Sequence, residues 1–284
     1  MRRPIRLAVL ECDHPLPQTA AKYGGRFGGV FKALLGQSAK TLNRPDIVDP
    51  EAGLDISEYD IVGGDEFPAL EDIDAVLISG SSACATYSTP FALLFLFFFL
   101  LGTSRLTSYC AWLEFDSFDT TTPWINRLVE FTKQVLAQDR VRLIGVCFGH
   151  QIIGRALGAR VGRSANGWEA SVHELTLTDQ GKEVFGAEKL NIMEMHRDVV
   201  YELPANTVAL GHTPKCSIQG MYNPRRFISV QGHPEFNRDI VMEIMQTRKA
   251  NYPSDVFDEA MKVIDNKQDG VLIGEAFLKF LAEE

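Results

Sequence analysis

The sequence lacks the features that mark several large classes of protein. It has no lysine- or arginine-rich run, and its 28 basic residues are outnumbered by 37 acidic ones, which gives a formal net charge of −9. A chain of this charge repels phosphate-rich surfaces, so we expect neither nucleic acid nor a membrane as a partner. It also contains no G-x-G-x-x-G pattern and no P-loop, so nothing indicates a phosphate-bearing ligand.

Cysteine is also scarce in this chain, and the few cysteines present do not form a framework. They are odd in number, lie far apart and make no C-x-x-C or His/Cys pairing, so we expect no metal and no cofactor: Cys12, Cys84, Cys110, Cys147 and Cys216. A reducing, cytoplasmic setting suits such a chain. The first residues are basic, but no long apolar stretch follows, so we expect no signal peptide.

Charge is nearly absent from residues 83–113, where Arg105 is the single charged residue in 31 positions. The chain average of 23% would place about seven there. The apolar run at 91–101 is too short to span a bilayer, which needs about 20 residues. Three interpretations stay open: a translated intron or other gene-model artefact, which we favour, a hydrophobic lid, or a membrane-dipping or partner-binding loop.

The remaining sequence alternates between strand-like and helix-like segments. Such alternation predicts an α/β fold, a doubly wound and mostly parallel sheet with helices on both faces. Apolar runs predict strands at 5–11, 75–78, 141–146 and 227–230, weaker ones at 47–48 and 59–62, further short ones at 190–195 and 208–210, and an antiparallel or edge strand at 172–177. Helical spacing predicts helices at 28–35, 124–136, 151–157, 240–245, 256–264 and 271–281.

No linker-like tract divides the chain, so we predict a single domain over residues 1–284. Its core covers about 5–249, with the atypical segment at about 83–113 and C-terminal helices at about 254–284. Thr122 followed by Pro123 predicts a helix start, with threonine as the N-cap and proline at the first helical position.

The segment Gly145–Gln151, GVCFGHQ, lies where a strand-like run meets a helix-like one. A cysteine between small residues at such a junction is typical of a nucleophile elbow. The tight turn needs glycine where the backbones nearly touch, and the helix N-terminus favours thiolate over thiol at Cys147. The alternative is a buried structural cysteine, which is the usual fate of an isolated one.

A second motif follows the apolar run at 227–230: VQGHPEF, residues 230–236. His233 falls just past a predicted strand, where α/β proteins place their chemistry. Glu235 lies two residues further, close enough to orient the imidazole. Cys147, His233 and Glu235 together offer a nucleophile, a base and an orienting acid.

The two motifs, some eighty residues apart, resemble those of the class I glutamine amidotransferases. The resemblance covers residues 6–248 apart from the atypical segment, and further matches are VLISGS at 76–81, Gly167-Trp168 and MEMHRD at 193–198. The start of the chain, RLAVLEC at 6–12 with KYGG at 22–25 and Phe27-Gly28, is more narrowly similar to free-standing members. Those are fungal amidotransferase-like proteins and plant γ-glutamyl peptidases, which carry no synthetase domain. A flavodoxin-like sheet is the fold this implies.

The resemblance implies hydrolysis of a γ-glutamyl amide, glutamine or a γ-glutamyl peptide, through a γ-glutamyl thioester on Cys147. Phe148 N–H, directly after the nucleophile, and the loop at Gly80 would bind the oxyanion. The resemblance also implies substrate-binding roles for Ser81, Gln151, His196 and Asp198. An ordinary exposed helix residue remains an alternative for Gln151, and ordinary polar turn residues remain an alternative for the last two. The expected partner is a small γ-glutamyl substrate.

Three other functions stay open. The chain could be a glutaminase subunit that supplies ammonia to a separate synthetase partner. It could be an α/β-hydrolase with a cysteine elbow, although the compact His233-Pro-Glu235 spacing differs from the acid-before-histidine order of that class. It could also be a catalytically silent binding or regulatory domain, if the atypical segment disrupts the oxyanion loop.

Overall fold

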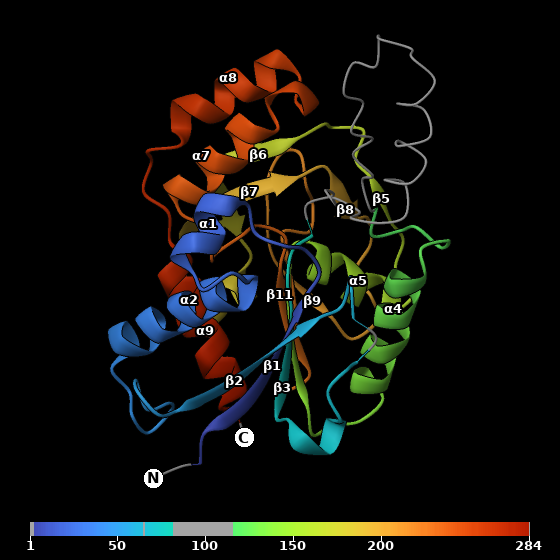
Figure 1. The fold of residues 1–284 in the computed structure, drawn as a ribbon, viewed down its shortest axis with the longest axis vertical. Helices are drawn as coiled ribbons and strands as arrows, with labels where there is room; N and C mark the ends of the chain where they lie inside the picture. The colour runs from blue at the N-terminus through green and yellow to red at the C-terminus, as the bar shows by residue number, and fades with distance from the viewer. Residues whose placement is uncertain (1–2, 65, 82–115, 284) are drawn as a thin grey trace, which may run out of the picture.

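A mixed β-sheet with helices on both sides forms the centre of the protein (Figure 1). The computed structural model describes residues 3–64, 66–81 and 116–283, so the segment 83–113 discussed above lies outside the described residues. Within them the main sheet has the order β2-β1-β3-β4-β11-β10-β9-β6-β7, and a small sheet pairs β5 with β8. The strands are β1 Ile5–Glu11, β2 Leu54–Asp60, β3 Ala75–Ile78, β4 Arg142–Val146, β5 Val161–Arg163, β6 Glu169–Leu177, β7 Lys189–His196, β8 Asp198–Val200, β9 Val208–His212, β10 Gly220–Asn223 and β11 Phe227–Val230.

The five strands from β2 to β11 in this order are parallel to their neighbours. The remaining strands pair antiparallel and extend the sheet from β11. In the parallel part Val146 at the end of β4 lies opposite Val230 at the end of β11. Parallel strands end at a common edge, so the residues after these two, including Cys147 and Gln231, emerge side by side.

Helices cover both faces of the sheet because the parallel strands are apolar on both faces. Along β1 the residues alternate between two cores: Leu7 and Val9 pack with α2 and α9, whereas Ala8 and Leu10 pack with α4 and α5. In Figure 1 these helix pairs lie on opposite sides of the sheet. The helices are α1 Pro17–Lys22, α2 Phe27–Leu42, α4 Pro123–Leu136, α5 Phe148–Ala156, α6 Asp179–Phe185, α7 Arg238–Thr247, α8 Ser254–Val263 and α9 Gly270–Leu281, with short 3-10 turns η1 Leu70–Asp72 and η2 Lys249–Asn251.

The predicted fold class is confirmed, and the strands predicted at 5–11, 75–78, 141–146 and 227–230 lie within a residue of their predicted positions. The antiparallel assignment of 172–177 is also confirmed by its pairing with β7 and β9. The strand predicted at 47–48 is wrong, because these residues form a turn closed by hydrogen bonds to Arg44 O. The strand predicted at 59–62 is displaced, since β2 ends at Asp60. Helix α4 begins as predicted, but the Thr122 hydroxyl donates to Asp119 rather than capping the helix.

Within the described residues no helix combines the length and apolar composition needed to cross a membrane.

Candidate active site

Cys147 occupies a tight turn between β4 and α5. Its backbone has φ 51° and ψ −102°, a conformation that costs a non-glycine residue about 1–3 kcal/mol. The turn is held by its N–H, which donates to Val230 O at 2.9 Å. It also needs glycine next to it: a Cβ on Gly149 would lie 2.2 Å from Ile78 O. The strand-to-helix elbow expected from the sequence is therefore present, and it carries strain at the sulfur-bearing residue.

His233 lies directly after β11 and is held on several sides. Its N–H donates to Met193 O on β7 at 2.7 Å, and its ring stacks on Phe236 with centroids 4.0 Å apart. Glu235 Oε1 is 2.8 Å from Nδ1, in a pair that is almost completely buried. This contact leaves Nε2 as the ring nitrogen available to another group.

The pKa of His233 depends on two neighbouring side chains, Cys147 and Glu235. Burial by itself would lower the pKa of the imidazole, but interaction with the Cys147 sulfur and with Glu235 outweighs burial and raises the pKa to about 10. The charged imidazolium is therefore the form of His233 that these surroundings favour near neutral pH. The carboxylate at Nδ1 adds to that preference because it stabilises the charged ring.

The loop after β3 approaches the histidine from another side. A Cβ added to Gly80 would lie 2.5 Å from His233 Cε1, so only glycine fits beside the ring. Ser79 fixes this loop, because its Oγ accepts from Cys12 N at 2.9 Å and its N–H donates to Leu10 O at 3.0 Å. Across the elbow, Phe148 N–H belongs to the first turn of α5 and has no partner within the helix. Gly80 therefore lies beside the His233 ring, and Phe148 lines the pocket together with Cys147; their oxyanion roles remain predictions.

Gln231 was not identified from the sequence, yet its amide faces the Cys147 sulfur. Its side chain is fully buried, and Nε2 lies 3.6 Å from Cys147 Sγ. Its orientation follows from a chain of contacts that begins at a backbone carbonyl. Asp198 O can only accept, so Gln151 presents its NH2 group there at 2.9 Å and donates its other hydrogen to Gln231 Oε1 at 3.1 Å. The NH2 group of Gln231 must then point to the sulfur.

A pocket opens over the sulfur. Its lining includes every substrate-binding residue predicted from the sequence, together with aromatic and charged side chains: Ser81, Asp116, Cys147, Phe148, Gln151, Arg163, Trp168, Met195, His196, Arg197, Asp198, Arg248, Asn251 and Tyr252. The amide hydrogens of Gln151 are already engaged, so only its Oε1 remains for a ligand. Asp198 accepts from Arg163 Nε at 2.8 Å, and burial raises the pKa of its carboxyl.

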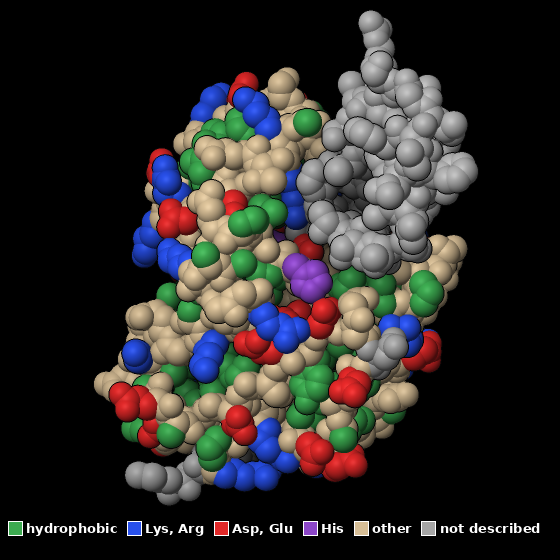
Figure 2. Space-filling view, in the orientation of Figure 1, with side chains coloured by type: hydrophobic (Ala, Val, Ile, Leu, Met, Phe, Trp, Pro, Cys, Tyr) green, Lys and Arg blue, Asp and Glu red, His purple; other side chains and the backbone are tan. Residues whose placement is uncertain are grey.

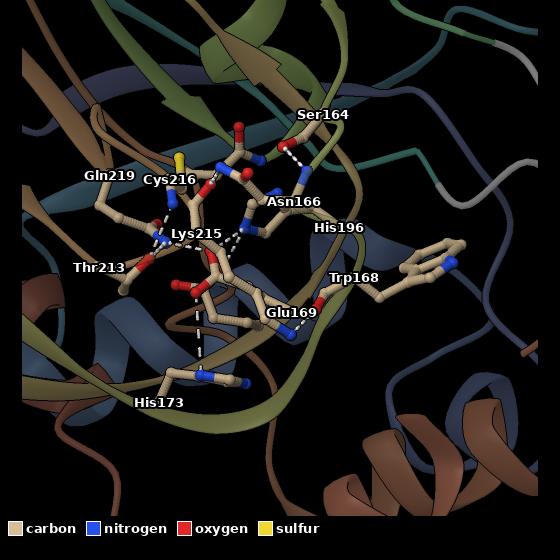
Figure 3. A network of polar contacts seen from close by, with 12 residues as sticks. Ser164, Asn166, Trp168, Glu169, His173, His196, Thr213, Lys215, Cys216 and Gln219 are labelled. Atoms are coloured by element: carbon tan, nitrogen blue, oxygen red, sulfur yellow. Dashed lines mark hydrogen bonds and ion pairs between the residues drawn. The ribbon is translucent and has the colours of Figure 1, made fainter. Parts of the chain in front are cut away.

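His196 also belongs to a buried polar network next to the pocket (Figure 3). Its Nε2 lies 3.1 Å from Glu169 Oε2 and 3.3 Å from Glu194 Oε2, and its Nδ1 lies 3.1 Å from Asp198 O. Burial alone would lower the pKa of His196, but the hydrogen bonds to the two glutamates raise it well above its ordinary value. Gln219 supports this arrangement by donating to Glu169 Oε2 at 2.8 Å.

This network contains a second cysteine beside a histidine and a glutamate. A sulfur of Cys216, a ring nitrogen of His196 and a carboxylate oxygen of Glu169 all lie within 4.8 Å of one another, and all three residues are buried. These ligand types suit a zinc ion. The proton held by His196, however, already supplies the positive charge that the neighbouring carboxylates require. Burial raises the pKa of the Cys216 thiol to about 11, so it stays protonated at neutral pH. We therefore assign this cluster to internal ion pairing.

The exposed surface carries no continuous basic area on the face shown in Figure 2, where acidic and basic side chains are interspersed. This pattern agrees with the acidic composition.

Comparison with known proteins places one part of the chain beside a known family. Residues 118–245 match the family model described as glutamine amidotransferase class-I. The match begins after the segment 83–113 and includes Cys147, His233 and Glu235.

Individual relatives carry related names. The chain is 28% identical to a glutamine amidotransferase-like protein of Schizosaccharomyces pombe over 98% of both sequences. It is 29% identical to gamma-glutamyl peptidase 4 of Arabidopsis thaliana over 81% of this chain and 76% of that protein. Among solved structures, a glutamine amidotransferase from Thermotoga maritima shares the fold, with a TM-score of 0.60 at 14% identity over 99% of both chains.

Proposed function

We propose that the protein hydrolyses a γ-glutamyl amide, either glutamine or a γ-glutamyl peptide, with Cys147 as nucleophile, His233 as acid and base, and Glu235 as the orienting acid. The observation that carries this proposal is the strained elbow, which presents the Cys147 sulfur to a pocket beside a histidine whose Nδ1 is held at 2.8 Å by a buried carboxylate. The family match and the likeness to gamma-glutamyl peptidases support the substrate class.

The reaction divides into two steps. The Cys147 thiolate attacks the γ-carbonyl carbon, and the oxygen gains negative charge beside the backbone N–H groups of Phe148 and the Gly80 loop. As the C–N bond breaks, His233 gives its proton to the leaving amine, so a γ-glutamyl thioester and a neutral imidazole remain. Water then attacks the thioester and loses a proton to His233, and glutamate and the thiolate are released.

Cys216 is the other candidate nucleophile, because it too lies near a histidine and a glutamate. Two observations favour Cys147. Cys147 lines the pocket, whereas Cys216 is not among the pocket residues. The pKa of the Cys216 thiol is raised to about 11 by burial, and a protonated buried thiol is a poor nucleophile.

The test compares two isosteric variants. Cys147→Ser should abolish glutamate release from glutamine and γ-glutamyl dipeptides, whereas Cys216→Ser should retain most of it. A glutamine-analogue chloroketone should label Cys147 ahead of the other thiols, as peptide mass mapping would show. If activity were lost in Cys216→Ser and kept in Cys147→Ser, Cys216, beside His196 and Glu169, would be the nucleophile instead.

A second candidate function is ammonia supply to a separate synthetase, since class I amidotransferase chemistry releases ammonia from glutamine. The two functions differ in substrate preference. A peptidase should cleave γ-glutamyl dipeptides faster than glutamine, whereas a glutaminase subunit should favour glutamine. A protein that cleaves neither, although its Cys147 is reactive, would be the catalytically silent domain.

A further inference from the structure

Arg248 is a buried cation at the end of helix α7. Its residue is 8% exposed, and its backbone is fixed by an N–H bond to Ile244 O at 3.0 Å and by Asn251 N, which donates to its carbonyl at 2.8 Å. The guanidinium thus extends from a rigid attachment point. It lines the same pocket as the Cys147 sulfur.

The Arg248 guanidinium has no ion-pair partner among the described residues. Its Nε is buried without a hydrogen-bond partner, and no carboxylate in 3–64, 66–81 or 116–283 forms an ion pair with it. The other buried or half-buried arginines near the pocket behave differently: Arg163 bonds to Asp198 and Asp116, and Arg155 donates to Ser117 O, Asp119 O and Asn126 Oδ1. A buried cation with no partner is costly, so it persists in proteins where a ligand supplies the counter-charge.

The charges around the pocket favour an anionic ligand. The lining contains two acids, Asp116 and Asp198, and both form ion pairs with Arg163. Arg197 in the same lining is exposed and makes no ion pair among the described residues. The pocket therefore carries more positive than negative charge. A planar guanidinium matches a carboxylate in particular, since two parallel N–H groups can bond to its two oxygens.

We propose that Arg248 binds a carboxylate of the substrate, and that the substrates are therefore γ-glutamyl compounds with a free carboxylate at that point. This inference rests on the proposed function, because the carboxylate must belong to the molecule whose γ-carbonyl meets Cys147. Two carboxylates of a γ-glutamyl dipeptide have the required chemistry: the α-carboxylate of the glutamyl unit and the C-terminal carboxylate of the leaving amino acid.

The experiment uses three substrates and three variants of the full chain. The substrates are a γ-glutamyl dipeptide, its C-terminal amide, and the dipeptide whose glutamyl α-carboxylate is amidated. The variants are Arg248→Met, which removes the donors and keeps the length, Arg248→Lys, and Lys249→Met as the matched control. Lys249 is exposed and adjacent, lies outside the pocket, and its removal changes the net charge equally.

The expected result is a loss of kcat/KM of about 30-fold or more for the dipeptide in Arg248→Met. One of the two amidated substrates lacks the carboxylate that Arg248 binds. Wild-type protein should cleave that substrate with a kcat/KM already about 30-fold below that of the dipeptide, and Arg248→Met should lower it little further. That amide identifies which carboxylate is bound. Arg248→Lys should recover part of the loss, and Lys249→Met should change none of the three substrates by more than about twofold, because an exposed charge is screened. Equal losses on all three substrates, or no loss, would overturn the proposal.

A binding measurement separates this inference from the proposed function. In Cys147→Ser protein, calorimetry should give a dissociation constant for the dipeptide that rises about 30-fold or more when Arg248→Met is added. If the wild type cleaves no γ-glutamyl compound but this binding difference appears, the proposed function fails and the carboxylate site stands. If cleavage occurs and the binding constants are equal, the proposed function stands and the role of Arg248 is refuted. Matching thermal unfolding of the variants excludes misfolding as the cause.

Discussion

Replacing Gln231 tests whether the amide that faces the Cys147 sulfur stabilises the thiolate. Gln231→Leu removes the donor that lies 3.6 Å from the sulfur. Gln231→Glu has nearly the same shape and still offers an oxygen to Gln151, but it turns a second carboxylate oxygen toward the sulfur. The two variants therefore differ in the sign of the interaction rather than in packing.

The expected size follows from the geometry. A hydrogen bond to a charged group contributes about 1.5–3 kcal/mol, and the long N···S distance places this one at the lower end. A loss of about 1.4 kcal/mol is a factor of ten. In Gln231→Leu we expect kcat/KM to fall about tenfold and the midpoint of the alkylation pH profile to rise by about one unit. The like charge in Gln231→Glu should enlarge both effects.

The assay is the rate of iodoacetamide alkylation of Cys147 between pH 5 and 10, run beside glutamate release. Cys84 and Cys110 are replaced by serine in the background. Cys12 and Cys216 are buried, and burial raises the pKa of both thiols, so they should not compete at neutral pH. Gln246→Leu is the matched control, because the Gln246 amide also contacts a sulfur, that of Met242, but at the surface. If Gln231→Leu and Gln231→Glu alkylate with the wild-type profile, the amide does not act on the thiolate.

Three further results are expected. Glu235→Gln should lower kcat/KM less than His233→Ala, since it keeps the base and removes only the charge at Nδ1; equal effects, measured as glutamate release, would place the orienting acid elsewhere. Gly80→Ala should lower kcat about 100-fold, because its Cβ would lie 2.5 Å from His233 Cε1 and displace the ring; wild-type turnover would contradict this contact. Burial lowers the pKa of His150 to about 3, so the folded state holds this imidazole neutral. Its contribution to the free energy of unfolding is present above pH 6.5 and is lost as pH falls toward 3. Urea unfolding should therefore show a smaller fall in the free energy of unfolding between these pH values in His150→Gln than in the wild type.

The prediction of the catalytic centre from sequence rested on short-range patterns. The elbow depends on a strand, a tight turn and a helix that are contiguous in the chain, and small residues at 145 and 149 are readable there. The His233–Glu235 pair is likewise local, because two residues of spacing already bring the carboxylate to Nδ1. The main strands could be predicted because strands buried on both faces are continuous apolar runs.

The weaker elements were predicted poorly because little local sequence pattern marks them. Strand β2 alternates between exposed and half-buried residues, and β5, β8 and β10 are only three or four residues long. Their hydrogen bonds come from partners distant in sequence, as in the pairing of β5 with β8. Local composition carries little of that information, so these elements were either displaced or not predicted.

The sequence by itself determined the fold class, through the alternation of strand-like and helix-like segments, and it pointed to the three residues proposed for catalysis, because each of their two motifs lies within a few contiguous positions. Only the tertiary structure decided what surrounds them. Gln231 reaches the sulfur of a residue 84 positions away because β4 and β11 end side by side. Arg248 lines the same pocket from the end of α7, and its missing counter-charge becomes visible only because Asp116 and Asp198 are both paired with Arg163. Burial and pairing are properties of the packed chain, and no short stretch of sequence contains them.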